Sequence, residues 1–188
     1  SLNLSTQSHI LTFDVRDRKA VFDAFETLPD EWKNVDILIN NAGNAHGLDP
    51  VQTATLDDWD AMIDGNVIGL MYVTNALLPK MIKNQKGHIV NLGSIAGKEV
   101  YPNGRVYCSS KFAVDAFTQG LRIDLNKDGI KVSAIHTGLV HTGFSEVRFK
   151  GNKERAAKVY EGIEALTAKD VADGILYMTQ VPNHVNVA

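Results

Sequence analysis

Tyr107 and Lys111 stand in the stretch Tyr-Cys-Ser-Ser-Lys, and their types and spacing could support proton transfer. On a helix, a residue and the fourth residue after it lie on one face, so the phenol and the ammonium would be neighbours. A phenol ordinarily titrates near ~10, but a fixed cation close by lowers the phenol pKa. The pair therefore predicts a general acid or base. So short a pattern also fits a solvated pair on a helix surface.

The elements that would position this pair alternate between short β-rich runs and longer amphipathic segments, as in a parallel sheet covered by helices. The pattern predicts strands over residues 9–13, 35–39, 88–92 and 131–135 and helices over residues 17–28, 55–83 and 105–127. Gly129 is a candidate left-handed cap behind the last helix. The sequence therefore predicts an α/β fold.

Composition is that of one soluble domain spanning residues 1–188. The chain has 188 residues, 44% of them hydrophobic, which suffices for one sizeable core. The net charge of −3 favours neither nucleic acid nor anionic lipid as a partner. The longest apolar runs fall short of the ~20 residues that span a bilayer, so we expect no membrane association. Cys108 is the single cysteine, which fits a reducing compartment, and we expect a cytoplasmic protein.

Further polar motifs stand in a fixed order along the chain: Asn40-Asn41-Ala42-Gly43 after an apolar run, then Asn66, then Ser94 at the end of a second run, then Tyr107 and Lys111. This ordered set resembles the short-chain dehydrogenase/reductase family over Asp14 to Thr142. The resemblance implies a doubly wound parallel sheet in a Rossmann-like three-layer sandwich. It implies an NAD(P)-dependent oxidoreductase that transfers a hydride between a nicotinamide and a small carbonyl or secondary alcohol.

Within the family, residues 57–59, 63–69, 77–81 and 104–107 are most similar to the NADP-dependent 3-hydroxy acid (serine, allo-threonine) dehydrogenases. This similarity implies NADP as the cofactor and a 3-hydroxy acid as a possible substrate. NAD stays open, because the side chains that discriminate the two nucleotides lie in the family's glycine turn and second strand.

The resemblance assigns four catalytic residues. Tyr107 is the acid/base, Lys111 lowers its pKa and binds the nicotinamide ribose, and Ser94 holds the substrate oxygen. Asn66 resembles the residue whose main-chain carbonyl holds a water that links Lys111 to solvent. For Asn66, an asparagine paired only with backbone is the alternative.

The cofactor contacts follow from the same resemblance. Asn40, Ala42 and Gly43 would lie along the adenosine ribose and the diphosphate, and Asp14 would touch the adenine ring. The loop after the last strand would face the nicotinamide through Val140 and Thr142, and Thr137 stands there in place of the family's usual proline. With Tyr107 and Lys111, these residues complete the expected cofactor set. An ordinary turn at residues 40–43 and a plain loop aspartate at Asp14 are the alternatives.

Substrate choice is expected in residues 139–165, which match the family's mobile lid. Phe144 and Arg148 supply an apolar and a cationic group there, and Arg148 could pair bidentately with a substrate carboxylate. Ser94 completes this expected substrate set, and Val100, Pro102 and Asn103 could line the opposite wall. A solvated charged loop is the alternative for residues 144–150.

A dinucleotide-binding domain normally opens with a strand, a glycine-rich turn and a helix that receives the pyrophosphate. These 188 residues have no such opening, and Gly43 to Gly47 is better interpreted as the turn that leaves a strand. By family comparison, we expect the first two strands, the helix between them and a last strand after Ala188 to be missing from this sequence.

The family packs its two long helices, here residues 55–83 and 105–127, between subunits, which implies a homotetramer. No carboxylate or cysteine stands at ligand spacing to His46, His136 and His141, so we expect no metal. One rival function is a catalytically idle dehydrogenase-like binding or regulatory protein. A second, a nucleotide-sugar epimerase or dehydratase, needs a larger domain after the last strand than residues 136–188 provide.

Overall fold

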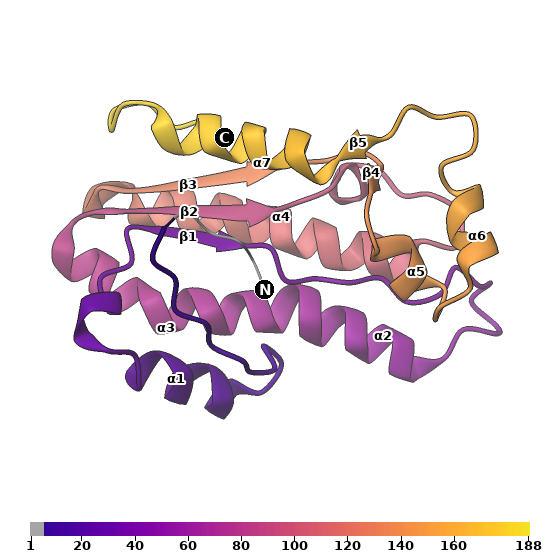
Figure 1. The fold of residues 1–188 in the computed structure, drawn as a ribbon, viewed down its shortest axis with the longest axis horizontal. Helices are drawn as coiled ribbons and strands as arrows, with labels where there is room; N and C mark the ends of the chain where they lie inside the picture. Colours follow the sequence, from indigo (N-terminus) through magenta and orange to yellow (C-terminus); the bar gives the residue numbers. More distant parts are fainter. Residues whose placement is uncertain (1–5) are drawn as a thin grey trace.

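The computed structural model describes residues 6–188, and a three-stranded parallel sheet lies at its centre (Figure 1). The strands are β1 (Ile37–Asn40), β2 (Gly87–Leu92) and β3 (Ile130–Ile135), side by side in that order. The register aligns Leu38 with Ile89 and Ile89 with Val132. β2 and β3 are buried over most of their length, whereas β1 is buried on one face only and exposes Ile37 and Ile39 on the other.

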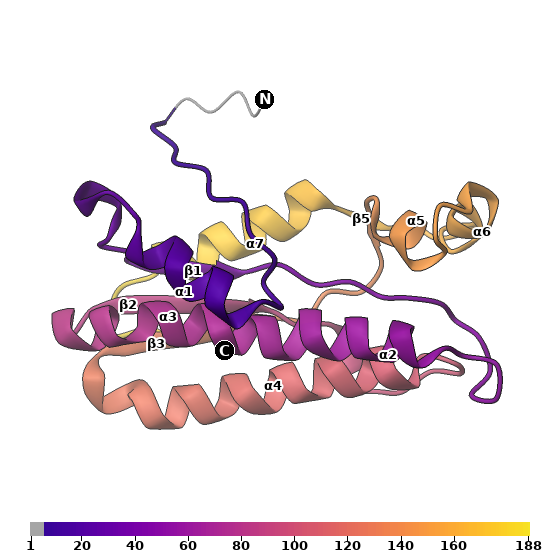
Figure 2. The same cartoon turned by 90° about the horizontal axis from the view of Figure 1, so that it is seen from below.

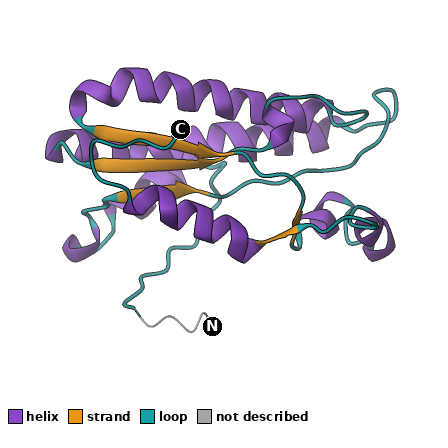
Figure 3. Ribbon diagram, turned by 90° about the horizontal axis from the view of Figure 1, so that it is seen from above, coloured by secondary structure: helices purple, strands orange, loops and turns teal. Residues whose placement is uncertain are grey.

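One face of the sheet is covered by α3 (Gly69–Asn84) and α4 (Arg105–Leu125), and the opposite face of β3 by α7 (Ala168–Gln180) (Figures 2 and 3). α1 (Arg18–Glu26) packs on α3. The core between sheet and helices consists of Leu38, Leu77, Met81, Ile89, Leu125, Ile130 and Val132. The arrangement is the predicted three-layer α/β sandwich.

The long second helix is one continuous rod with a local irregularity. It runs from α2 (Leu56–Ile63) through a π-helical turn (Asp64–Ile68) into α3. Thr55 caps its start, accepting a hydrogen bond from the Asp58 backbone N–H. The prediction over residues 55–83 is confirmed, but the widened turn, which contains Asn66, has no signal in the hydrophobic period.

Two local signals place the other helix ends. The Asp17 carboxylate accepts from the Ala20 N–H and starts α1. Gly129 has φ +70°, so it ends the turn behind α4 in the left-handed conformation, as predicted.

The predicted strand over residues 9–13 is wrong. This segment is extended, but none of the five strands described for residues 6–188 pairs with it. Instead its rings pack locally, with His9 on Trp32 and Phe13 on Phe25, and Ile10 is 77% exposed. Alternating apolar residues make a strand only where a neighbour supplies hydrogen bonds.

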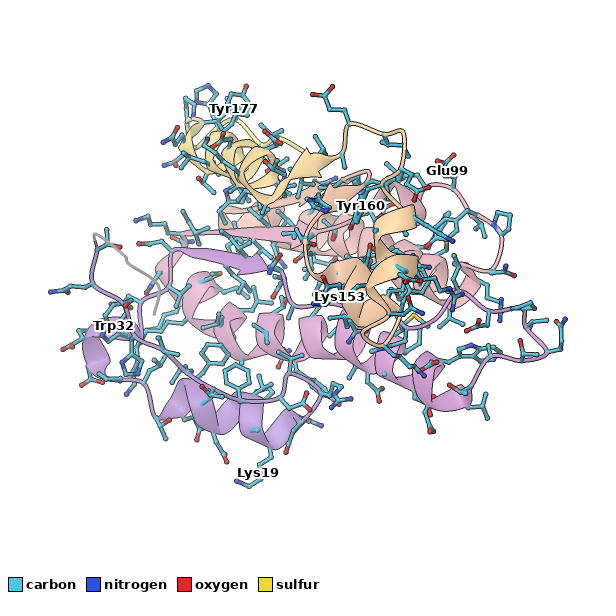
Figure 4. All side chains as sticks on the ribbon, turned by 45° about the vertical axis from the view of Figure 1, so that its right-hand side comes forward. Lys19, Trp32, Glu99, Lys153, Tyr160 and Tyr177 are labelled. Carbon is cyan, nitrogen blue, oxygen red and sulfur yellow. The ribbon has the colours of Figure 1, made fainter. Side chains whose placement is uncertain are left out.

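The segment after β3 forms a small unit at the carboxyl ends of the strands (Figure 1). It contains β4 (Val140–His141), α5 (Phe144–Arg148), α6 (Lys153–Lys158) and β5 (Leu166–Thr167), and β4 pairs in parallel with β5. Figure 4 labels Lys153 and Tyr160 on this segment in front of the strand ends.

Within residues 6–188, the helix Leu56–Asn84 is the one helix long and apolar enough to cross a membrane. It is a core helix here, since its residues Leu70, Leu77 and Met81 are buried and its α3 part packs against β1 and β2. Core helices of soluble proteins pass the same test, so this helix is weak evidence for a membrane.

Candidate active site

Tyr107 and Lys111 lie on one face of α4, and both line a cavity of about 760 Å³ at the carboxyl ends of the strands. Lys111 Nζ lies 5.9 Å from the Tyr107 ring centroid. Ligands of open α/β sheets bind at this edge. The predicted pair is therefore adjacent and faces a cavity.

Ser94 lies directly after β2 and reaches the same cavity. Its hydroxyl accepts from the Ala96 N–H at 3.1 Å, which starts a short 3-10 turn. The turn packs closely on α4, because a Cβ at Gly97 would lie 2.7 Å from the Lys111 carbonyl oxygen. Ser94 and Tyr107 both line the cavity, and the Ser94 hydroxyl lies near enough to the phenol to lower the Tyr107 pKa by hydrogen bonding.

The protonation states differ from the sequence prediction. Burial raises the pKa of Tyr107 above its ordinary value, and hydrogen bonding to Ser94 only partly offsets this effect. Burial also lowers the pKa of Lys111 to about 8. The net shift of the Tyr107 pKa is therefore opposite to the lowering expected from Lys111, because desolvation of the phenolate outweighs hydrogen bonding to Ser94 and the charge of Arg148. Lys111 Nζ donates instead to the Leu92 carbonyl at 2.9 Å.

The Asn66 side chain joins the loop after β1 to α4. Its Oδ1 accepts from the Asn44 N–H at 2.7 Å, and its Nδ2 donates to the Asn44 carbonyl at 2.8 Å. Nδ2 also donates to Ser110 Oγ at 3.0 Å, and Ser110 Oγ donates to the Tyr107 carbonyl at 2.7 Å. Asn66 is thus paired with the Asn44 backbone and also with the Ser110 side chain, so the alternative of pairing only with backbone is wrong, and Ser110 links it to the Tyr107 carbonyl.

The predicted cofactor residues 40–43 divide into two groups. Gly43 lines the cavity, and a Cβ there would lie 3.0 Å from Asn66 Oδ1. The Asn40 amide is buried, donates to Thr74 Oγ1 and Asn91 Oδ1, and does not line the cavity. Strand alternation turns Asn40 toward the helices, and Asn41 lines the cavity instead. Ala42 is exposed and does not line the cavity.

Asp14 does not line the cavity either. Its carboxylate pairs with the Arg16 guanidinium at 2.6 Å, and this hydrogen bonding holds the Asp14 pKa at about 2. The group is exposed, so the pairing is a surface contact.

Val140, Thr142, Phe144 and Arg148 all line the cavity, from the segment after β3. The Phe144 ring meets the Tyr107 ring edge-on at 5.7 Å. The Arg148 guanidinium lies 5.5 Å from the centroids of both Tyr101 and Tyr107. Arg148 Nε donates to the Gly47 carbonyl, and Nη2 donates to Tyr101 Oη at 2.9 Å. Arg148 is therefore held against Tyr107 and not in a solvated loop.

Sequence reasoning missed Tyr101 and Asn44. Tyr101 lines the cavity, and its hydroxyl accepts a hydrogen bond from Arg148 Nη2. The Asn44 backbone carbonyl accepts a hydrogen bond from Asn66 Nδ2. Gly104, three residues before Tyr107, is the available signal for Tyr101, because a Cβ at Gly104 would lie 2.1 Å from that ring. Among residues 6–188, no three His, Cys, Asp or Glu side chains gather as metal ligands do.

The family model described as short chain dehydrogenase matches residues 2–153. The chain belongs to the short-chain dehydrogenase family. The predicted membership and the NAD(P)-dependent oxidoreductase class are confirmed, and these matches do not support the idle alternative.

Similar proteins within the family are named dehydrogenases. NADP-dependent 3-hydroxy acid dehydrogenase YdfG of Salmonella typhi is 45% identical over 175 residues, which are 93% of this chain and 71% of that protein. Serine 3-dehydrogenase of Agrobacterium fabrum is 41% identical over 179 residues, 95% of this chain and 72% of that protein.

A solved structure, the closed form of serine dehydrogenase complexed with NADP+, superposes with a TM-score of 0.91 at 45% identity, over 93% of this chain and 71% of that one. Serine dehydrogenase from Escherichia coli gives a TM-score of 0.79 at 39% identity, over the same shares of both chains.

Proposed function

We propose that this chain catalyses NADP-dependent hydride transfer at the secondary alcohol, or the corresponding carbonyl, of a small 3-hydroxy acid. The observation that supports it most is the placement of Arg148 against Tyr107 in the wall of the cavity. The Arg148 guanidinium, 5.5 Å from the ring centroid of the proposed acid/base, suits a substrate that has a carboxylate near its hydroxyl. The names of the relatives point to the same substrate class.

NADP is the proposed cofactor, since relatives are named for it and a similar structure binds it. The residues fit its nicotinamide half: Lys111 has three N–H donors, one of which is used by Leu92, and its Nζ is buried at the cavity wall. The remaining donors would hold the ribose hydroxyls, and Val140 and Thr142 would face the nicotinamide. When bound, the nicotinamide accepts or supplies the hydride.

The side chains of this protein position the oxygen and move the proton. Ser94 would hold the substrate oxygen beside the Tyr107 phenol. Because burial raises its pKa, Tyr107 is protonated at neutral pH, which is the form that protonates a carbonyl oxygen during reduction. In oxidation the phenolate would take the hydroxyl proton while the hydride leaves the same carbon.

We further propose that residues 139–165 form the substrate lid. Two ion pairs support this lid by joining it to α2 and to the loop before α2: Lys150 with Asp58 at 2.9 Å and Arg155 with Asp49 at 3.5 Å. A homotetramer through the two long helices is proposed because Leu56, Phe112 and Ile123 remain exposed on them. Cytoplasmic localisation is proposed from the single, buried Cys108.

The test is turnover of a 3-hydroxy acid and of a neutral secondary alcohol of equal size, with NADPH or NADP+ binding followed by nicotinamide fluorescence. Tyr107→Phe should bind nucleotide and lose turnover of both substrates. Arg148→Met should raise KM for the acid by about 10- to 100-fold and leave the neutral alcohol unchanged. Lys153→Met, an exposed lid cation, is the control. Absence of nucleotide binding would overturn the proposal.

A further inference from the structure

His136 follows β3 directly, and its ring lies between two hydrogen-bond acceptors. Nδ1 is 3.2 Å from the Ser94 carbonyl oxygen, and Nε2 is 3.3 Å from Asp115 Oδ1. The Ser94 carbonyl can only accept, so Nδ1 must carry the hydrogen of this bond. The Asp115 carboxylate lies within ion-pair distance of Nε2, on the other side of the ring.

The surroundings of Asp115 leave one oxygen for His136. Asp115 Oδ2 accepts from Lys98 Nζ at 2.7 Å and from Gln119 Nε2 at 2.8 Å, so Oδ1 is turned to the histidine. The His136 side chain is 23% exposed and that of Asp115 is 15% exposed, which limits screening by solvent. The carboxylate comes from α4, the same helix that carries Tyr107.

The other charged groups near this pair are already engaged. Lys98 follows the 3-10 turn after Ser94 and binds Asp115. On α7, which packs against β3, Lys169 pairs with Asp173, and Asp170 caps the helix through Thr167. Asp115 is therefore the carboxylate that pairs with His136 among the described residues.

The ring also fixes the backbone around Ser94. A Cβ at Gly93 would lie 2.5 Å from His136 Nδ1, so the ring packs directly on that glycine. The Gly93 N–H donates to the Ile135 carbonyl at 2.9 Å, and the Ile95 N–H donates to the Thr137 carbonyl at 3.0 Å. Ser94 thus lies between two backbone bonds, and His136 binds the carbonyl between them.

We propose that His136, which donates from Nδ1 to the Ser94 carbonyl and packs on Gly93, is a positioning residue that holds the Ser94 backbone and so aims the Ser94 hydroxyl at the substrate oxygen. This inference rests on the proposed function for its effect on turnover. Loss of the hydrogen bond to the Ser94 carbonyl loosens the turn that carries Ser94. We expect this loosening to lower kcat and to leave nucleotide affinity unchanged.

Two substitutions separate the bonds from the packing. His136→Phe keeps a ring on Gly93 without donors and should lower kcat by about 3- to 10-fold, the effect of one net hydrogen bond. His136→Gln can still donate to Ser94 and should recover part of that loss. Nucleotide affinity should stay unchanged in both. Lys98→Met removes the lysine that pairs with Asp115; it is the control and should retain wild-type kcat.

NMR supplies a second readout. Ring 15N spectra should show a histidine with a hydrogen on Nδ1 that disappears in His136→Gln. A His136 ring without a hydrogen on Nδ1, or wild-type kcat in His136→Phe, would overturn the inference.

The NMR measurement needs no turnover. If the protein reduces no carbonyl compound, the proposed function fails, and a His136 ring whose Nδ1 carries no hydrogen would separately overturn the positioning role. Thermal melts of both variants show whether they fold.

Discussion

Lys111 donates a hydrogen bond from Nζ to the carbonyl oxygen of Leu92 at 2.9 Å, so the last residue of β2 holds the buried cation of α4. The bond spans the sheet and the helix layer at the edge where the cavity opens. The Lys111 ammonium is buried without a carboxylate partner among the described residues. The lysine that the proposed mechanism needs therefore lowers the stability of the fold.

Lys111→Met should stabilise the fold at pH 7 by roughly 1–3 kcal/mol while abolishing turnover. Burial lowers the pKa of Lys111 from 10.5 to about 8, so the unfolded state binds more protons between these two values. Wild-type stability therefore rises with pH across that window, and the advantage of the variant should shrink. Urea unfolding at pH 7 and pH 10 measures it, with the exposed Lys80→Met as control. A variant less stable than wild type at both pH values would contradict this account.

His88 should make the fold acid-sensitive. Burial lowers its pKa from 6.5 to about 4, and its Nε2 lies 2.9 Å from Ser133 Oγ. The unfolded state takes up the proton below pH 6.5, so stability falls as the pH drops from 6.5 toward 4, by roughly 2–3 kcal/mol. Urea unfolding across this range should show a shallower decline in His88→Gln. His184→Gln, at an exposed site, should leave the slope unchanged.

Asn66→Ala should loosen the loop after β1. The substitution leaves the Asn44 backbone N–H and carbonyl without their amide partner, which costs about 1–3 kcal/mol of unfolding free energy. The Asn66 amide also donates to Ser110 Oγ, which in turn donates to the Tyr107 carbonyl, so kcat should fall as well. Chemical unfolding and steady-state kinetics test both. Asn75→Ala, on an exposed position of α3, should change neither, and equal effects in the two variants would count against the pairing.

Gly93→Ala should destabilise the protein because the new Cβ would lie 2.5 Å from His136 Nδ1. The cost should be smaller in a His136→Ala background, where the ring is gone. A double-mutant cycle by thermal or urea unfolding gives the coupling free energy, expected at about 1 kcal/mol or more. Additive effects would show that Gly93 is required for another reason.

Local signals in the sequence were sufficient for most of the architecture. The runs ending at Asn40, Leu92 and Ile135 predict parallel strands, and the polar residues just behind them predict an active-site edge, because strand ends of one sheet share one side. Tyr107 and Lys111 were placed correctly by the helical period alone. These features depend on residues close together in the chain.

The tertiary structure decided what depends on distant neighbours. Residues 9–13 alternate like a strand but have no pairing partner among residues 6–188. The direction of the Asn40 amide, the stacking of Arg148 on two tyrosines and the pairing of His136 with Asp115 all join segments far apart in sequence. The raised pKa of Tyr107 has the same origin, since desolvation is set by everything packed around the phenol, and no spacing of residues along one helix encodes it.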